Sequence, residues 1–195
     1  MAGHPMLCVV RHGQTDWNAE GRLQGRKDIP INGRGRDQAA AVGRELLRMR
    51  PEVAGFRYVS SPLGRTRETM EIMRRAMGLG ASGYATDRRL MELTFGDWEG
   101  LTWNEVQSRD PQGASARDAD KWAFTPPRGE SYADLTTRIR GWLDDLEVPT
   151  VAVTHGGVAR ALLGILTGMA PDDLTACVIT QGRALMVEDG RASWI

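Results

Sequence analysis

The chain has 195 residues, of which 25 are Lys or Arg and 25 are Asp or Glu, so its formal net charge is zero. This length suits one domain with a substantial buried core, and the balanced charge gives no sign of a nucleic-acid or membrane partner. The chain has no run of about 18 apolar residues, the length a membrane helix needs. Its first ten residues lack the basic and apolar regions of a signal peptide, so we expect a cytoplasmic protein.

The first third of the chain is predicted to alternate strand, helix and strand. The apolar run MLCVV (6–10) predicts a buried strand, and a polar, Gly-rich loop follows to about residue 33. A helix comes next, because apolar residues recur on one helical face at Ala39, Val42, Leu46 and Met49. FRYVS (56–60) then predicts a second strand.

A second helix is predicted directly after that strand. Ser61 is its candidate N-cap, and Pro62 suits a first helical turn. One face of this helix carries an apolar stripe, formed by Leu63, Thr66, Met70, Met73 and Met77. The simplest interpretation of a Met-rich stripe is packing in the core.

Residues 88–128 are more irregular and predict a short strand or turn, a short helix near 102–108 and a mobile, polar excursion. SYAD (131–134) places Ser and Asp three residues apart, which is a helix-capping signal. The helix after it has an apolar face, made by Leu135, Ile139, Trp142, Leu143 and Leu146. Further strands are predicted at TVAVT (150–154), ACVIT (176–180) and RALMVED (183–189), with a helix between the first two that runs to about Leu166.

This alternation predicts an α/β fold, a three-layer sandwich with a mostly parallel central sheet. We expect one domain over residues 1–195, with residues 93–128 inserted as a small cap. Cys8 and Cys177 lie in apolar runs, which favours buried thiols over a disulfide or a metal pair.

Two of the predicted strands end in histidine followed by glycine, at VVRHG and AVTHGG. In open α/β sheets, ligands bind beyond the carboxyl ends of strands. If the two strands are neighbours, His12 and His155 would face each other across one crevice, and the helix after Gly157 would offer free N–H groups to an anion. A single histidine at a strand end is commonly ordinary loop chemistry, but two in the same setting favour a shared site.

Arginines extend this pattern. Arg11 flanks His12. Arg65 falls in the first turn of the helix beginning near Ser61, and this position directs its side chain to the same edge of the sheet. We expect Arg67, on another face of that helix, to be exposed to solvent. Arginine binds phosphate oxygens through a planar fork of donors, so this set of side chains suits a dianion such as a phosphoryl group. Metal binding is the alternative for two histidines, but it requires carboxylates or cysteines where the strand ends supply arginine.

The segment Arg11-His12-Gly13-Gln14-Thr15, with Asn18 three residues on, resembles the signature of the histidine phosphatase superfamily, also called phosphoglycerate mutase-like. The resemblance spans most of the chain. Four further segments match in order: LQGRKDIPINGRGRDQA (23–39), SSPLGRTRET (60–69), LMELTFGDWEGLT (90–102) with RGES (128–131), and VTHGG (153–157).

This resemblance implies a role for each matching residue. His12 would be the nucleophile, attacking phosphorus as the neutral imidazole to form phosphohistidine. Arg11, Arg65 and His155 would bind the equatorial oxygens, with further hydrogen bonds from Asn18 and the Gly156 N–H. Gln24 and Gly25 would lie at the rim. Glu92 would be the general acid, whereas Glu99 is interpreted as structural.

The resemblance also implies a reaction. The interval from Glu92 to Ser131 is short and resembles the phosphatase branch, which favours hydrolysis of a small phosphorylated metabolite without metal or other cofactor. The alternatives are a phosphoglycerate mutase, which is a phosphotransferase, and a binding module that has lost its chemistry. For the oligomeric state, a homodimer is one option.

Two sets of side chains near the cap have open roles. The aromatic residues form either an apolar substrate wall or part of the core, and they are Trp17, Phe95, Trp98, Trp103 and Trp122. Arg109, Arg117 and Lys121 either read a second acidic group on the substrate or belong to a solvated surface.

Overall fold

The computed structural model describes residues 4–195. The first three residues of the N-terminal segment, which we expect not to be a signal peptide, lie outside this range. The strands are β1 (Leu7–Arg11), β2 (Arg57–Ser60), β3 (Ala85–Thr86), β4 (Thr150–Thr154), β5 (Ala184–Glu188) and β6 (Arg191–Trp194). The α-helices are α1 (Asp16–Ala19), α2 (Gly33–Met49), α3 (Gly64–Ala76), α4 (Trp103–Arg109), α5 (Pro111–Ala119), α6 (Tyr132–Asp144), α7 (Gly156–Thr167) and α8 (Pro171–Ala176). Short 3-10 turns are η1 (Pro51–Gly55), η2 (Arg88–Leu90) and η3 (Gly96–Trp98). Between residues 4 and 195, none of the helices has the length and apolar character that a membrane crossing requires.

The described strands form one six-stranded sheet in the order β3-β2-β4-β1-β5-β6. The first four are mutually parallel, and β5 and β6 are antiparallel to their neighbours. Arg11 pairs with Thr154, so β1 and β4 end at the same edge of the sheet. The next residues, His12 and His155, are therefore neighbours, as the sequence predicts.

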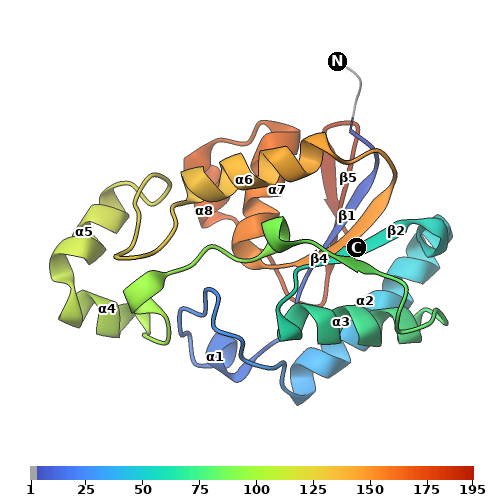
Figure 1. Ribbon diagram of the computed structural model, residues 1–195, viewed down its shortest axis with the longest axis horizontal. Helices are drawn as coiled ribbons and strands as arrows, with labels where there is room; N and C mark the ends of the chain where they lie inside the picture. The colour runs from blue at the N-terminus through green and yellow to red at the C-terminus, as the bar shows by residue number, and fades with distance from the viewer. Residues whose placement is uncertain (1–3) are drawn as a thin grey trace.

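Helices cover both faces of the sheet, which confirms the predicted three-layer sandwich (Figure 1). Side chains alternate along β1: Leu7 and Val9 pack in one core cluster with α6, α7 and α8. Cys8 and Val10 pack in the other, with α2 and α3. Each fully buried aliphatic side chain contributes about 1.5–3 kcal/mol, so the two clusters hold the strand ends in fixed positions.

The cap segment is more ordered than its polar sequence predicts. The excursion expected after residue 108 contains a helix that the sequence analysis does not predict, because Pro111–Ala119 forms α5. The Asp110 side chain caps this helix by accepting from the Gly113 N–H at 2.9 Å. Trp98, Val106 and Ala114 make a small separate core, and Figure 1 shows α4 and α5 to one side of the sheet.

The helix after the second strand begins later than expected. Leu63 is the N-cap of α3, and Ser61 is not, because the Ser61 hydroxyl contacts His155 instead. The predicted apolar stripe is confirmed, since all five of its members are buried, and they are Leu63, Thr66, Met70, Met73 and Met77. Arg67 is exposed, as expected.

The predicted strand 176–180 is wrong. The segment runs without strand pairing after α8, and Val178 is 74% exposed. Its carbonyl groups accept hydrogen bonds from arginine side chains near the sheet edge rather than from another strand. Cys8 is a buried free thiol, as predicted, but Cys177 is only half-buried. Strand β6, which the sequence analysis does not predict, pairs with β5.

Candidate active site

The predicted site residues meet in one cavity of about 170 Å³ at the carboxyl edge of β1 and β4. Eight of them line it: Arg11, His12, Asn18, Gln24, Gly25, Arg65, Glu92 and Gly156. His155 lies directly behind, with its ring centroid 5.2 Å from that of His12. The cavity wall carries several arginines against the single carboxylate of Glu92, so it favours an anion.

The His12 ring has a defined tautomer. Its Nδ1 lies 2.8 Å from the Gly13 carbonyl, which can only accept, so Nδ1 carries the proton and Nε2 keeps its lone pair. Burial, followed by the nearby charges of Arg65 and Arg11, holds the pKa of His12 well below its usual range. The imidazole is therefore neutral near pH 7, the form that can act as a nucleophile.

Gly13 allows two backbone segments of the protein to approach each other closely. A Cβ at this position would lie 2.3 Å from the Gly35 carbonyl oxygen in the first turn of α2. The glycine thus allows α2 to approach β1, rather than a ligand to approach the backbone. The Gly13 N–H donates to the Thr69 hydroxyl at 3.0 Å, which ties the loop after β1 to α3.

Arg65 is 1% exposed, and its orientation is fixed on three sides. Its two Nη atoms donate to the carbonyls of Lys27 and Gly25, each at 2.7 Å, and its Nε lies 3.3 Å from His12 Nε2. Burial lowers the pKa of Arg65 to about 10, with opposing effects from Glu92 and Asp28, so the side chain remains cationic at pH 7. The sequence predicts this position correctly.

His155 is completely buried and rests on Ser61. Its Nε2 lies 2.9 Å from the Ser61 hydroxyl, which itself accepts from the Leu63 N–H at 3.4 Å. Burial and the charge of Arg65 hold the pKa of His155 well below its usual range. Ser61 is a site residue that the sequence analysis missed, because the pattern Ser-Pro before a helix also fits an N-cap.

Three buried polar atoms have no hydrogen-bond partner among residues 4–195, and all three belong to this site. They are Arg11 Nε, Gln24 Nε2 and His155 Nδ1. Buried donors are nearly always paired in folded proteins. Arg11 and Gln24 line the cavity, and His155 stacks edge-on against His12. An oxyanion in the cavity would supply acceptors that the protein itself does not provide.

Glu92 is held by two backbone amides. Its Oε2 accepts from the Gly157 N–H at 3.0 Å, in the first turn of α7, and its Oε1 accepts from the Leu93 N–H at 3.1 Å. Glu99 lies behind Gly25, outside the cavity lining, and its Oε1 accepts from the Thr94 hydroxyl at 2.7 Å and from the Arg26 N–H at 2.9 Å. These contacts fit the structural role predicted for Glu99.

Asn18 and Gln24 belong to one amide network. Gln24 Oε1 accepts from the Thr15 hydroxyl at 2.9 Å and from Asn18 Nδ2 at 3.3 Å. Gln181, from the loop before β5, donates to Asn18 Oδ1 at 2.9 Å. Gln24 is 6% exposed, so it is buried in the wall rather than at the rim where we expect it. Gln181 has no signal in the sequence.

The aromatic residues lie in the cavity wall, in the cap core and against the main core. Of the five candidates for a substrate wall, Phe95 lines the cavity. Trp98 is buried in the cap core, where Trp103 packs on it, and Trp122 stacks on Tyr132. Tyr132 and Arg160 also line the cavity, and the sequence analysis missed both. Tyr132 lies at the start of a helix and Arg160 follows a pair of glycines, and both patterns are common in proteins at positions far from any site.

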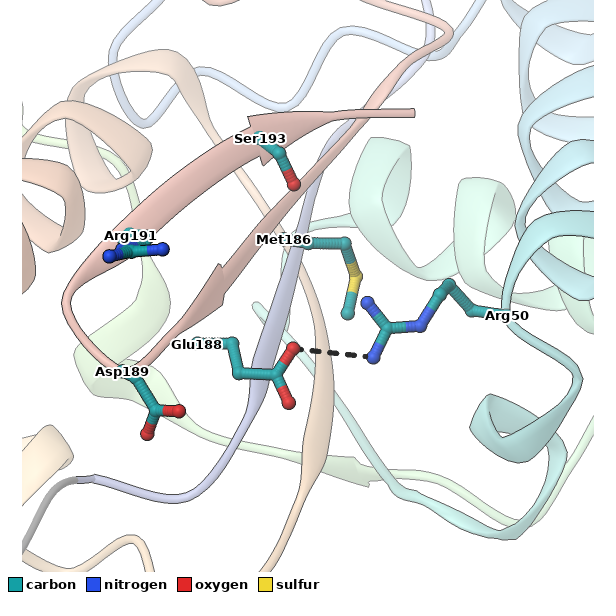
Figure 2. A pocket seen from close by; sticks show the side chains of 6 residues that line it. All are labelled: Arg50, Met186, Glu188, Asp189, Arg191 and Ser193. Carbon is teal, nitrogen blue, oxygen red and sulfur yellow. Dashed lines mark hydrogen bonds and ion pairs between the residues drawn. The ribbon is translucent and has the colours of Figure 1, made fainter.

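A second hollow, of about 490 Å³, lies at the other end of the sheet, between the end of α2 and the β5–β6 hairpin. Figure 2 shows Arg50 paired across it with Glu188, while Arg191 and Asp189 lie nearby. Charges of both signs line it without a histidine or cysteine. The chemistry of this protein is therefore assigned to the first cavity.

Comparison with known proteins agrees with this geometry. Residues 7–192 match the model of the histidine phosphatase superfamily (branch 1), and the chain belongs to that family. Glucosyl-3-phosphoglycerate phosphatase of Mycolicibacterium vanbaalenii is 34% identical over 180 residues, which cover 86% of this chain and 76% of the relative. A probable phosphoglycerate mutase of Yersinia enterocolitica is 34% identical over 171 residues, covering 85% and 76%. The structure of mycobacterial glucosyl-3-phosphoglycerate phosphatase with VO3 superposes with a TM-score of 0.79 at 28% identity, covering 98% of this chain and 96% of that one.

The chain is thus a histidine phosphatase. The superfamily acts through a phosphohistidine, and relatives named as phosphatases favour hydrolysis over the mutase reaction. The phosphatase assignment made from the sequence is confirmed at this level.

Proposed function

We propose that this protein hydrolyses a small phosphomonoester with His12 as nucleophile and Glu92 as general acid and base, without a metal ion. The observation that carries the proposal is the state of His12. Its Nδ1–H is bound to the Gly13 carbonyl, so the lone pair of Nε2 faces the arginine-lined cavity. A neutral, oriented imidazole beside fixed cations is what attack on a phosphoryl group requires.

In the first step, His12 Nε2 forms a bond to phosphorus as the bond from phosphorus to the ester oxygen breaks. The departing alkoxide takes the proton of the Glu92 carboxyl group. Arg65 Nε, 3.3 Å from His12 Nε2, would turn from the imidazole to a phosphoryl oxygen. Arg11 Nε, His155 Nδ1 and the Gly156 N–H at the start of α7 are available for the remaining oxygens.

In the second step, water attacks the phosphohistidine. The Glu92 carboxylate takes a proton from the water, the bond from nitrogen to phosphorus breaks, and inorganic phosphate leaves with neutral His12 restored. Asn18, held by Gln181 and Gln24, supports the oxyanion from the side. Gly25 contributes through its carbonyl, which positions Arg65.

The partners proposed with this activity are a small phosphorylated metabolite, with neither nucleic acid nor membrane, and a cytoplasmic location. We further propose that residues 1–195 form one domain in which residues 93–128 are the cap. A substrate like that named for the mycobacterial relatives, glucosyl-3-phosphoglycerate, combines a phosphate with a carboxylate and is a candidate.

The proposal is tested by trapping the intermediate. Wild-type protein quenched during turnover of a ³²P-labelled substrate should carry a label that is stable to base and labile to acid, and His12→Ala should carry none. With ³²P-labelled 4-nitrophenyl phosphate, whose leaving group needs little protonation, Glu92→Gln keeps the nucleophile and should accumulate the label. Hydrolysis of 4-nitrophenyl phosphate at equal rates by wild type and His12→Ala would refute the assignment. With 3-phosphoglycerate, release of free phosphate indicates a hydrolase, and formation of 2-phosphoglycerate indicates a mutase.

A further inference from the structure

The segment RGES (128–131) resembles a segment of the family, but the mechanism above uses none of its side chains. Ser131 caps α6, and Glu130 lies directly before it with a side chain that is 15% exposed. The Glu130 N–H donates to the Thr94 carbonyl at 2.9 Å, two residues beyond Glu92. A largely buried carboxylate therefore lies beside the segment that carries the general acid.

The Glu130 carboxylate joins two arginines from distant parts of the chain. Arg138 of α6 donates from Nε to Oε1 at 3.1 Å and from Nη2 to Oε2 at 2.8 Å. Arg26, in the loop between α1 and α2, donates from Nη2 to Oε2 at 3.1 Å. Because paired hydrogen bonds to one carboxylate fix the plane of a guanidinium, Glu130 determines where the remaining donors of Arg138 point, and it holds the end of the Arg26 side chain.

Both guanidiniums direct another donor to the backbone around Glu92. Arg26 Nε donates to the Glu92 carbonyl at 3.1 Å, and Arg138 Nη1 donates to the Met91 carbonyl at 2.9 Å and to the Arg89 carbonyl. Between η2 and η3 the chain forms neither helix nor strand, so it has no ladder of backbone hydrogen bonds. Side-chain donors oriented by Glu130 hold this stretch instead.

The other interpretation of these contacts is an ion-pair cluster that serves stability alone. Arg26, Glu130 and Arg138 lie outside the cavity lining, so they reach the reaction only through the backbone of Glu92. A general acid works only when its oxygen lies within hydrogen-bond reach of the leaving oxygen, and a small displacement lowers the rate strongly. The two interpretations therefore differ in one measurable property, the protonation of the leaving group.

We propose that Glu130 is a positioning residue, which fixes the backbone of Glu92 through Arg26 and Arg138 and so aims the Glu92 carboxyl group at the leaving oxygen. The inference rests on the proposed function, in which Glu92 is the general acid. It gives the RGES segment a part in the reaction although none of its side chains contacts the cavity.

The test compares two substrates that differ in their need for a proton. Phenyl phosphate and 4-nitrophenyl phosphate share the ring and the phosphate, but phenolate is the more basic leaving group and depends more on Glu92. The quantity measured is kcat/KM for phenyl phosphate divided by kcat/KM for 4-nitrophenyl phosphate. Any loss of folded protein cancels from this ratio, so a purely stabilising role would leave it unchanged.

The variants assign the effect to the cluster. Glu92→Gln should lower the ratio at least about tenfold, and Glu130→Gln and Arg26→Met should each lower it at least about threefold. In a Glu92→Gln background, Glu130→Gln should cause no further fall, because its effect passes through the Glu92 carboxyl group. Glu45→Gln is the matched control, since Glu45 pairs with Arg48 at the far end of α2, and it should leave the ratio as in wild type.

Two results would overturn the positioning role. One is a fall of less than threefold in either Glu130→Gln or Arg26→Met, and the other is an equal fall caused by Glu130→Gln with and without the Glu92 carboxyl group. Failure of the proposed function would be distinct, because Glu92→Gln itself would then leave the ratio unchanged.

Discussion

The two buried imidazoles should make the stability of the protein depend steeply on pH just below neutrality. His12 and His155 both have a pKa well below the usual 6.5 in the folded state, chiefly because burial disfavours the charged form. In the unfolded chain each would titrate near 6.5. Below that pH the unfolded chain binds protons that the folded protein does not, so stability is complete above pH 6.5 and is lost as pH falls.

The size of this effect follows from the number of groups. Between pH 7.5 and 5.5, a histidine that stays neutral when folded costs about 1.4 kcal/mol of unfolding free energy, and two cost about 2.7 kcal/mol. That is a large part of a typical stability of about 5–15 kcal/mol. The carboxylates whose pKa is lowered, such as Asp87, start from ordinary values near 4, so they change charge mainly below this window.

Urea unfolding in phosphate-free buffer at pH 7.5, 6.5 and 5.5 measures the effect. Wild type should lose about 2.7 kcal/mol across the series, His12→Asn about 1.4 kcal/mol, and the double variant with His155→Asn almost nothing. The exposed His4 provides the control, since His4→Asn should follow wild type. A wild-type loss below about 1 kcal/mol, or an equal loss in the double variant, would show that these imidazoles are not held neutral.

Three further predictions concern catalysis. Glu92→Gln should give a burst of nitrophenol from 4-nitrophenyl phosphate, because this leaving group needs little protonation. The turnover that follows should be slowed roughly 10²–10⁴-fold, because the attacking water still needs a base. Stopped-flow traces with slow turnover and no burst would contradict this. Gly157→Ala places a Cβ 2.4 Å from Glu92 Oε1 and should lower kcat at least about tenfold, because it displaces that carboxylate. Gly141→Ala is the control: its Cβ would have no atom within 4 Å, so kcat should stay unchanged and the melting temperature should rise. Dialysis against EDTA should not change the rate, since arginines rather than carboxylates surround His12; a loss restored by a divalent metal would count against the site.

The residues that could be predicted from the sequence are those tied to regular patterns. Short apolar runs mark β1 and β4, and each ends in His-Gly, so parallel pairing alone brings His12 and His155 together. Arg65 follows from its place in the first turn of a helix after a strand. Glu92 has no such pattern: it lies between two 3-10 turns, and it was selected through family resemblance rather than through periodicity.

The cap residues could not be predicted, for a physical reason. Helix α5 buries only Ala114, so its sequence has no apolar stripe, and Asp110 and Pro111 at its start are equally common in loops. The position of Arg117 depends on stacking against Trp103, a contact between two cap helices. Tertiary contacts of single side chains leave no periodic signal, which is why recognition by the cap could only be posed as an alternative.

The wrong strand at 176–180 is the most informative difference, because hydrogen bonds of another kind hold this segment. Four groups of this stretch bind side chains of the cap and the cavity: the carbonyls of Thr175, Cys177 and Ile179 accept from Lys121, Arg160 and Arg11, and the Gln181 amide donates to Asn18. Thr175 still belongs to α8, and the residues after it have no strand pairing, so the partners of this stretch are side chains of the cap and the cavity rather than another strand. One segment thereby orients Arg11 and Arg160, two cations of the cavity wall, so a shift of its backbone would move both of them together.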